Sequence, residues 1–173
     1  YELLKTKAYF CFEVGYFHDV LKNNFFDTIY HEHLDYHHVG PLIPFLKGIG
    51  FSIVFISTNN IQGGSLRMLC KKESKPKIYS QPIKFLNKEE KSILNKSNHI
   101  QNWSRLINSK MKYFHKYINK NYTQGKKIYG YGAPTKAPLL IKLSNISNMI
   151  QYVVEDNDLK VNKYLPKTKI KIV

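Results

Sequence analysis

The length and composition of the chain limit what it can be. Its 173 residues, 43% of them apolar and 14% aromatic, suffice for one ordinary domain or two small ones and exclude disorder as the overall state. No apolar run approaches the roughly 18 residues that cross a bilayer, and the first residues lack the order of a signal peptide. We therefore expect a soluble, cytoplasmic chain with no membrane partner. Tyr1 in place of a starting methionine suggests an upstream part that has been cut off.

The net charge of +15 suggests a nucleic-acid partner, but its distribution weakens that interpretation. Residues 1–70 carry a net charge of −1, and residues 71–173 carry +16. Only Arg67 and Arg105 among the 27 basic residues are arginine, whose bidentate fork suits the recognition of bases. A general bias toward lysine, asparagine and isoleucine is a sufficient explanation, and we expect no nucleic-acid partner.

The first part of the chain predicts short strands alternating with helices. Compact apolar runs indicate buried strands, and a run that has a proline near its start and ends in glycines indicates a helix. In chain order we expect a strand at 8–14, a helical turn at 17–21, a short extended or loop segment at 27–30, a helix at 39–47, and strands at 51–57 and 65–71.

The second part predicts a linker, a helical stretch and one β-α-β unit. Residues 73–86 contain two prolines and a charge run, which are typical of a linker. Between 87 and 121, apolar positions that include Ile93 and Leu94 recur at spacings of three, four and seven and predict one or two helices. A strand at 127–131, a helix at 135–143 and a strand at 150–154 form the β-α-β unit of a parallel sheet.

A cluster of titratable side chains is the most unusual feature of the first part. Within eight residues stand His31, Glu32, His33, Asp35, His37 and His38, preceded by Tyr30. Three interpretations are open from the residues alone. The histidines can be loop residues that cap the next helix or lie in solvent. They can form a metal site from His31, His33 and a third ligand that the spacing does not dictate. One of them can be a general base, oriented by a neighbouring carboxylate.

Six motifs resemble those of the S-adenosylmethionine-dependent sugar C-methyltransferases, which methylate carbon in nucleotide-linked deoxysugars. They are FEVGY at 12–16, FDTIYHEHL at 26–34, GGSLR at 63–67, GYGAPTK at 130–136, YVVEDN at 152–157 and KYLP at 163–166. FDTIYHEHL is long and chemically distinctive, whereas the glycine motifs alone would be weak. The resemblance covers nearly the whole chain, and the lysine-rich helical stretch matches least.

The resemblance implies an α/β fold in two parts. Residues 1–72 would be the C-terminal part of the catalytic domain, the back half of a class I, Rossmann-like methyltransferase sheet. Residues 73–86 would be the linker, and residues 87–173 a helical segment followed by a second small Rossmann-like α/β unit. The chain departs from the family pattern at four positions. Gly15 stands where the family usually has proline, and Gln62 where it often has histidine. Ala137 and Asn162 stand where the family usually has glycine.

By the same resemblance, the chain is part of an enzyme that transfers a methyl group from S-adenosylmethionine to a carbon of a keto-deoxysugar joined to a nucleoside diphosphate. His33 would be the base that removes the proton at C3, beside the 4-keto group, and the enolate would attack the sulfonium methyl. Glu32 and Tyr30 would line the same pocket and orient the sugar or the base. His31 would point to the opposite face and serve the structure.

Five further residues are candidates for binding substrate: Gly64, Ser65, Arg67, Gly132 and Lys136. The turn that contains Gly132 could hold a phosphate at a helix N-terminus, with Lys136 as counter-charge, or be only a tight strand-to-helix turn, which we favour. Arg67 could pair with a substrate phosphate or with the carboxylate of a neighbouring strand. No metal ligands belong to this set, because Cys11 and Cys70 form no CxxC pair.

Two parts of the family pattern do not occur in this sequence. An early glycine-rich turn followed by an acidic residue at the end of the next strand would hold S-adenosylmethionine, and a cysteine-rich module would hold zinc. We therefore expect the cofactor to be bound mainly by an upstream half, zinc only in an N-terminal module, and the chain to be inactive alone. The rival functions are a non-catalytic basic module that grips phosphate-rich partners and a metal-dependent hydrolase that uses His31, His33 and a distant ligand.

Overall fold

The computed structural model describes residues 1–30, 32–92 and 98–173, so His31, Ile93 and Leu94 lie outside the described residues. The contacts divide the chain into two compact units. The first comprises Tyr1–Phe26 and His33–Trp103, and the second comprises Asp27–Glu32 and Ser104–Val173. Each unit has its own hydrophobic core. Among the helices of the described residues, none combines the length and the apolar character that a membrane span requires.

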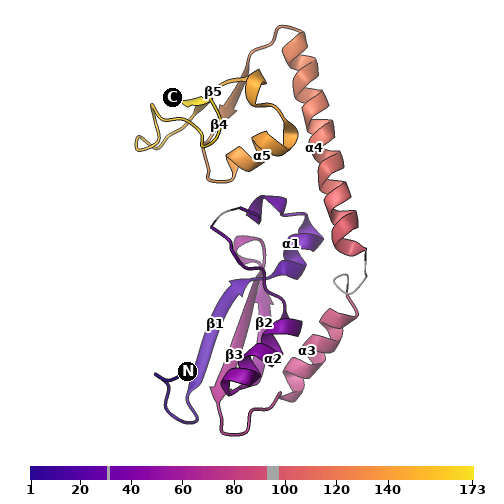
Figure 1. Ribbon diagram of the computed structural model, residues 1–173, viewed down its shortest axis with the longest axis vertical. Coiled ribbons are helices and arrows are strands. Elements are labelled where there is room, and N and C mark those ends of the chain that lie inside the picture. The colour runs from indigo at the N-terminus through magenta and orange to yellow at the C-terminus, as the bar shows by residue number, and fades with distance from the viewer. Residues whose placement is uncertain (31, 93–97) are drawn as a thin grey trace. The chain divides into compact units, whose positions relative to one another are not determined.

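The first unit is a three-stranded sheet with two helices packed on one face (Figure 1). Its strands are β1 (Tyr9–Gly15), β2 (Phe51–Asn59) and β3 (Ser65–Lys72). The order is β1-β3-β2, and the central strand β3 runs antiparallel to both neighbours. Its helices are α1 (Phe17–Asn23), α2 (Val39–Ile49) and α3 (Ser80–Glu90), with the 3₁₀ turn η2 (Ile61–Gly63). A further 3₁₀ turn, η1 (Phe26–Thr28), has its first residue in the first unit and the other two in the second.

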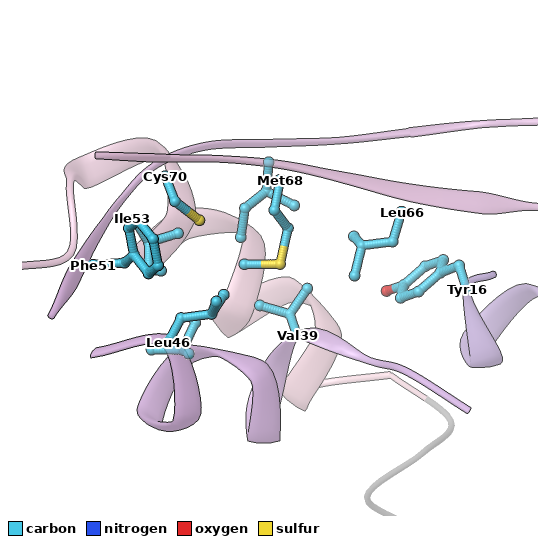
Figure 2. Close-up of a cluster of buried hydrophobic side chains, with 10 residues drawn as sticks. Tyr16, Val39, Leu46, Phe51, Ile53, Leu66, Met68 and Cys70 are labelled. Atoms are coloured by element: carbon cyan, nitrogen blue, oxygen red, sulfur yellow. The ribbon is translucent and has the colours of Figure 1, made fainter. Parts of the chain in front are cut away.

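Strand β3 supplies the centre of the first core because its side chains alternate strictly between the two faces of the sheet. Leu66, Met68 and Cys70 are fully buried, and Figure 2 shows them directed with Val39 and Leu46 of α2 into one cluster. In β2 the alternation shifts by one residue, since a bulge between Ile53 and Phe55 puts Ile56 on the buried face.

The strands β1, β2 and β3 and the helix α2 confirm the sequence predictions to within two residues. The segment 73–86, for which a linker was expected, makes contacts with β2. Ile78 pairs with Ile53, and the Gln81 side chain exchanges two hydrogen bonds with the backbone of Ile56. Helix α3 begins inside this segment, at Ser80. Pro82 is the third residue of α3, where a missing N–H costs nothing because the first turn has no internal acceptor for it.

The second unit contains the predicted β-α-β unit and one further strand. Its elements are α4 (His99–Thr123), whose first residues lie in the first unit, β4 (Ile128–Tyr131), α5 (Ala137–Ser144), η4 (Ser147–Met149), β5 (Ile150–Val154) and β6 (Lys171–Ile172). The strand order is β4-β5-β6, with parallel pairing throughout. Strand β6 was not expected, because two residues are too few to show an alternating pattern. The core consists of Ala133, Ile141, Ile146, Val153, Leu165, Ile170 and Ile172.

Candidate functional site

The motif FDTIYHEHL at 26–34, called the histidine motif below, follows the first strand and helix of the chain and precedes α2. Tyr30 is partly buried, whereas Glu32 and His33 are exposed. The contacts divide the chain between these last two residues, so that Tyr30 and Glu32 belong to the second unit and His33 to the first. The carboxylate of Glu32 and the imidazole of His33 are thus neighbours in sequence on an exposed segment, outside any helix or strand.

The backbone at the end of this segment is fixed to the end of β1. Tyr16 forms a parallel bridge with His37, and the amide of Phe17 donates to the His37 carbonyl over 2.9 Å. The amide of Tyr16 donates in turn to the carbonyl of Gly64 over 3.0 Å. The residues after His33 therefore enter α2 from a defined position at the carboxyl end of β1.

A buried carboxylate that the sequence analysis did not identify lies under this connection. Glu89 of α3 accepts a hydrogen bond of 2.8 Å from the Tyr16 hydroxyl and two more from backbone amides of α2. Burial, together with the Glu89 carboxylate, raises the pKa of Tyr16 well above its ordinary value, so this hydroxyl stays protonated. The signal in the sequence was its spacing, since Glu89 falls seven residues after Pro82 on the inner stripe of α3, with Phe85 between.

A cavity of about 290 Å³ lies beside Tyr16 and Glu89 within the first unit. His18 and Asp19 of α1 also line it, with their side chains 3.6 Å apart. Asp19 packs directly against Gly64, which stands at the start of β3. The structure therefore brings the predicted residue Gly64 to the same end of the sheet as the titratable groups of this cavity.

The candidates Ser65 and Arg67 have partners inside the protein. The buried Ser65 hydroxyl donates to the Ile61 carbonyl over 3.2 Å. Arg67 faces Glu13 across the β1–β3 pair, and its Nε and Nη2 lie 2.9 and 2.7 Å from one carboxylate oxygen. Hydrogen bonds from Asn59 and Arg67 lower the pKa of Glu13. Of the two partners that the sequence left open for Arg67, the structure shows the carboxylate of the neighbouring strand.

The turn after β4 is closed by an acidic side chain. Gly132 has φ +79°, and the next amide, that of Ala133, donates to Glu155 at the end of β5 over 2.7 Å. Lys160 lies 3.2 Å from the same carboxylate oxygen. This amide is therefore already satisfied by a carboxylate, and a phosphate placed there would meet a like charge. The geometry agrees with the tight-turn interpretation.

Lys136, one turn further on, forms an ion pair with Asp27 of the histidine motif. The Lys136 ammonium lies 3.2 Å from the Asp27 carboxylate, and both side chains are about two-fifths exposed. Asp27 and Lys136 belong to the same unit by contacts. The pair joins the glycine turn of the β-α-β unit to the start of the motif, although a solvent-exposed pair adds little to stability.

Two departures from the family pattern stand at left-handed backbone positions. Asn162 has φ +63°, in the left-handed region that asparagine tolerates better than other residues apart from glycine. Gln62 also lies there, with φ +51°, inside the turn η2. Asparagine thus keeps the conformation where the family has glycine.

For metal binding, no group of three or more His, Cys, Asp or Glu in the described part of the chain is arranged to hold an ion.

Glu155 makes the stability of the second unit depend on pH. The Ala133 amide and Lys160 lower its pKa below the ordinary value of 4.5, so its contribution is present above that value and disappears as the pH falls through the lowered pKa. We expect the difference in unfolding free energy between the wild type and Glu155→Gln to stay constant above about pH 5.5 and to shrink as the pH falls below 4.5 in urea titrations. A difference that is the same at every pH would contradict this assignment.

Comparison with known proteins shows the family to which this α/β chain belongs. The sequence model of the C-methyltransferase C-terminal domain matches residues 60–173, and the chain belongs to this family. It is also similar to the C-methyltransferase NovU of Streptomyces niveus, with 27% identity over 172 residues. This alignment covers 98% of the chain, including the motif, and 41% of NovU. The chain thus spans less than half the length of this relative.

Proposed function

We propose that the chain is the substrate-activating part of an S-adenosylmethionine-dependent C-methyltransferase that acts on a keto-deoxysugar joined to a nucleoside diphosphate. The observation that carries the proposal is the exposed Glu32-His33 pair in a chain of the C-methyltransferase family. In such a sugar, a protein base can readily deprotonate only a carbon that lies beside the ketone, because the resulting carbanion is stabilised as an enolate. An exposed imidazole next to a carboxylate has the chemistry for this step near neutral pH.

In the proposed reaction His33 acts as the general base. Its imidazole takes the proton from C3 of the sugar, the electron pair of that C–H bond moves toward the 4-keto oxygen, and an enolate and an imidazolium form. Glu32 orients the ring and stabilises its positive charge, and the Tyr30 hydroxyl donates a hydrogen bond to the developing charge on the sugar. Groups of this kind typically contribute about 10²- to 10⁴-fold in rate.

The substrate-binding roles follow from the geometry of the remaining candidates. Lys136 is exposed enough to exchange Asp27 for a diphosphate oxygen. Arg67 would have to leave Glu13 to do the same, and Gly132 shapes a turn whose amide is taken by Glu155. Gly64 and Ser65 shape the end of the sheet beside the cavity. We therefore propose Lys136 as the principal cation for the diphosphate.

The residues of the described glycine turn do not fit S-adenosylmethionine, because Glu155 and Lys160 already occupy the turn amide and its surroundings. We propose that another part of the enzyme holds this methyl donor and that zinc, if present, belongs to that part too. The sheet β1-β3-β2 would complete a Rossmann-like methyltransferase sheet. The first unit supports this assignment because its strand β1 is followed by helices and by the antiparallel pair β2 and β3. The second unit is Rossmann-like in that its strands pair in parallel.

The proposal is tested with an enzyme rebuilt by placing a cofactor-binding half upstream of Tyr1. Given a nucleotide-linked 4-keto-deoxysugar and S-adenosylmethionine, it should form a sugar heavier by one methylene group, detected by mass spectrometry. In D₂O without the methyl donor, deuterium should enter the carbon beside the ketone. Methyl transfer only to nucleic acid or protein, with none to the sugar, would refute the proposal.

A second measurement concerns the chain by itself. Titration calorimetry with S-adenosylmethionine should detect no binding in the micromolar range, because the described residues offer no free glycine-rich turn for it. The rebuilt enzyme, measured in the same buffer, is the positive control. Micromolar affinity of the isolated chain would contradict the assignment of the methyl donor to another part of the enzyme.

A further inference from the structure

The carboxylate of Glu89 is the most completely buried charge-bearing group among the described side chains that the proposed reaction does not use. Only 4% of its side chain is exposed. Oε1 accepts from the Tyr16 hydroxyl at 2.8 Å and from the Val39 amide at 3.0 Å, and Oε2 accepts from the Gly40 amide at 3.0 Å. The Nδ1 of His38 lies 3.4 Å from Oε2. Burying a carboxylate to this extent costs free energy unless hydrogen-bond partners satisfy its oxygens, and here four polar groups surround it.

Two of these contacts replace the missing cap of α2. The residue at the N-cap of α2 is His38, and its side chain makes no capping hydrogen bond. Glu89 reaches across from α3 and accepts from the first two amides of the helix, at Val39 and Gly40. A negative charge at this end also interacts favourably with the helix dipole. The start of α2 is thus fixed by a residue about fifty positions away in the sequence.

The segment that this anchor fixes is the one that carries the proposed base. His33 stands five residues before His38, in the same unit as Glu89. Tyr16, which donates to Glu89 through its hydroxyl, also pairs through its backbone with His37. Glu89 therefore holds residues 37–40, the downstream end of the segment that carries His33, in two ways: through the start of α2 and through Tyr16.

We propose that Glu89 is a positioning residue for His33, which it orients by fixing the backbone at 37–40. This inference rests on the proposed function, because it assumes that His33 is the base. The substitution Glu89→Gln keeps the size of the side chain but turns one acceptor oxygen into an NH₂ group, which cannot accept from the backbone amides. The motif segment then loses part of its anchor while His33, Glu32 and Tyr30 are unchanged.

The kinetic test uses the rebuilt enzyme with Glu89→Gln. We expect kcat to fall by about 10- to 100-fold, as for other residues that orient a reacting group, with the KM for the methyl donor changed less than about twofold. Glu90→Gln makes the same chemical change on an exposed neighbour in α3 and should retain the wild-type kcat. If Glu89→Gln does not fold, Glu89→Asp, which keeps the charge but shortens the side chain, is measured instead.

A double-mutant cycle separates positioning from a purely structural role. In a His33→Asn background, a residue that acts through His33 should lower the residual rate by less than about twofold, because the group that it orients is gone. An equal loss in both backgrounds would overturn the proposal. Amide hydrogen exchange on the 173-residue chain gives a readout that does not depend on the reaction. Glu89→Gln should raise the exchange rates of Val39 and Gly40 and of the amides at 32–38, and unchanged rates at 32–38 would also overturn it.

Discussion

Replacing His33 with asparagine should reduce methyl transfer by the rebuilt enzyme by about 10²- to 10⁴-fold, the contribution typical of a general base. Asparagine keeps a polar side chain of similar reach but takes up no proton near neutral pH. The loss should appear in kcat, and deuterium exchange at the carbon beside the ketone should disappear with it. Steady-state rates and exchange, measured on the same preparation, check this expectation.

The same substitution elsewhere provides the control. His99→Asn changes a histidine at the start of α4, outside the motif, and should leave both rates at the wild-type level. Near-normal turnover of His33→Asn would refute the assignment of the base. Loss of methyl transfer with deuterium exchange retained would place His33 after the deprotonation step and contradict its proposed role.

Replacing Gly64 with alanine should destabilise the first unit by roughly 2–5 kcal/mol, for two reasons that act together. Gly64 has φ +131°, a conformation that residues with a Cβ rarely adopt. An added Cβ would also lie 2.4 Å from the Cβ of Asp19, so that α1 would have to move away from the start of β3. Urea unfolding followed by circular dichroism measures the change in free energy.

Two other glycines separate these contributions. Gly125 has φ +78° but open space around its Cα, so Gly125→Ala should cost only the backbone penalty of about 1–2 kcal/mol. Gly15 has neither a positive φ nor a neighbour within 4 Å, and Gly15→Ala should change stability by less than about 0.5 kcal/mol. If Gly64→Ala were as stable as Gly15→Ala, the close approach of α1 to β3 would be wrong.

The elements that the sequence predicted are those whose signal is local. Neighbouring residues alone were enough to predict the apolar runs of β1, β2 and β3 and the glycine that ends α2. The β-α-β unit could be predicted for the same reason. Pro82 contributed to the prediction of a linker at 73–86 although it lies in the first turn of α3, because a proline at the start of a helix and a proline in a loop look alike without the tertiary contacts of Gln81.

For the candidate site too, local features could be predicted from the sequence, whereas contacts between distant residues could not. The sequence by itself determined the family, the motif with Glu32 and His33, and the concentration of positive charge in the second part of the chain. Only the tertiary structure decided that Arg67 pairs with Glu13, that Glu155 closes the glycine turn, and that Glu89 caps α2. Residue type and spacing are properties of the chain, whereas these partners lie between 22 and 54 positions apart and meet only because the strands and helices pack together.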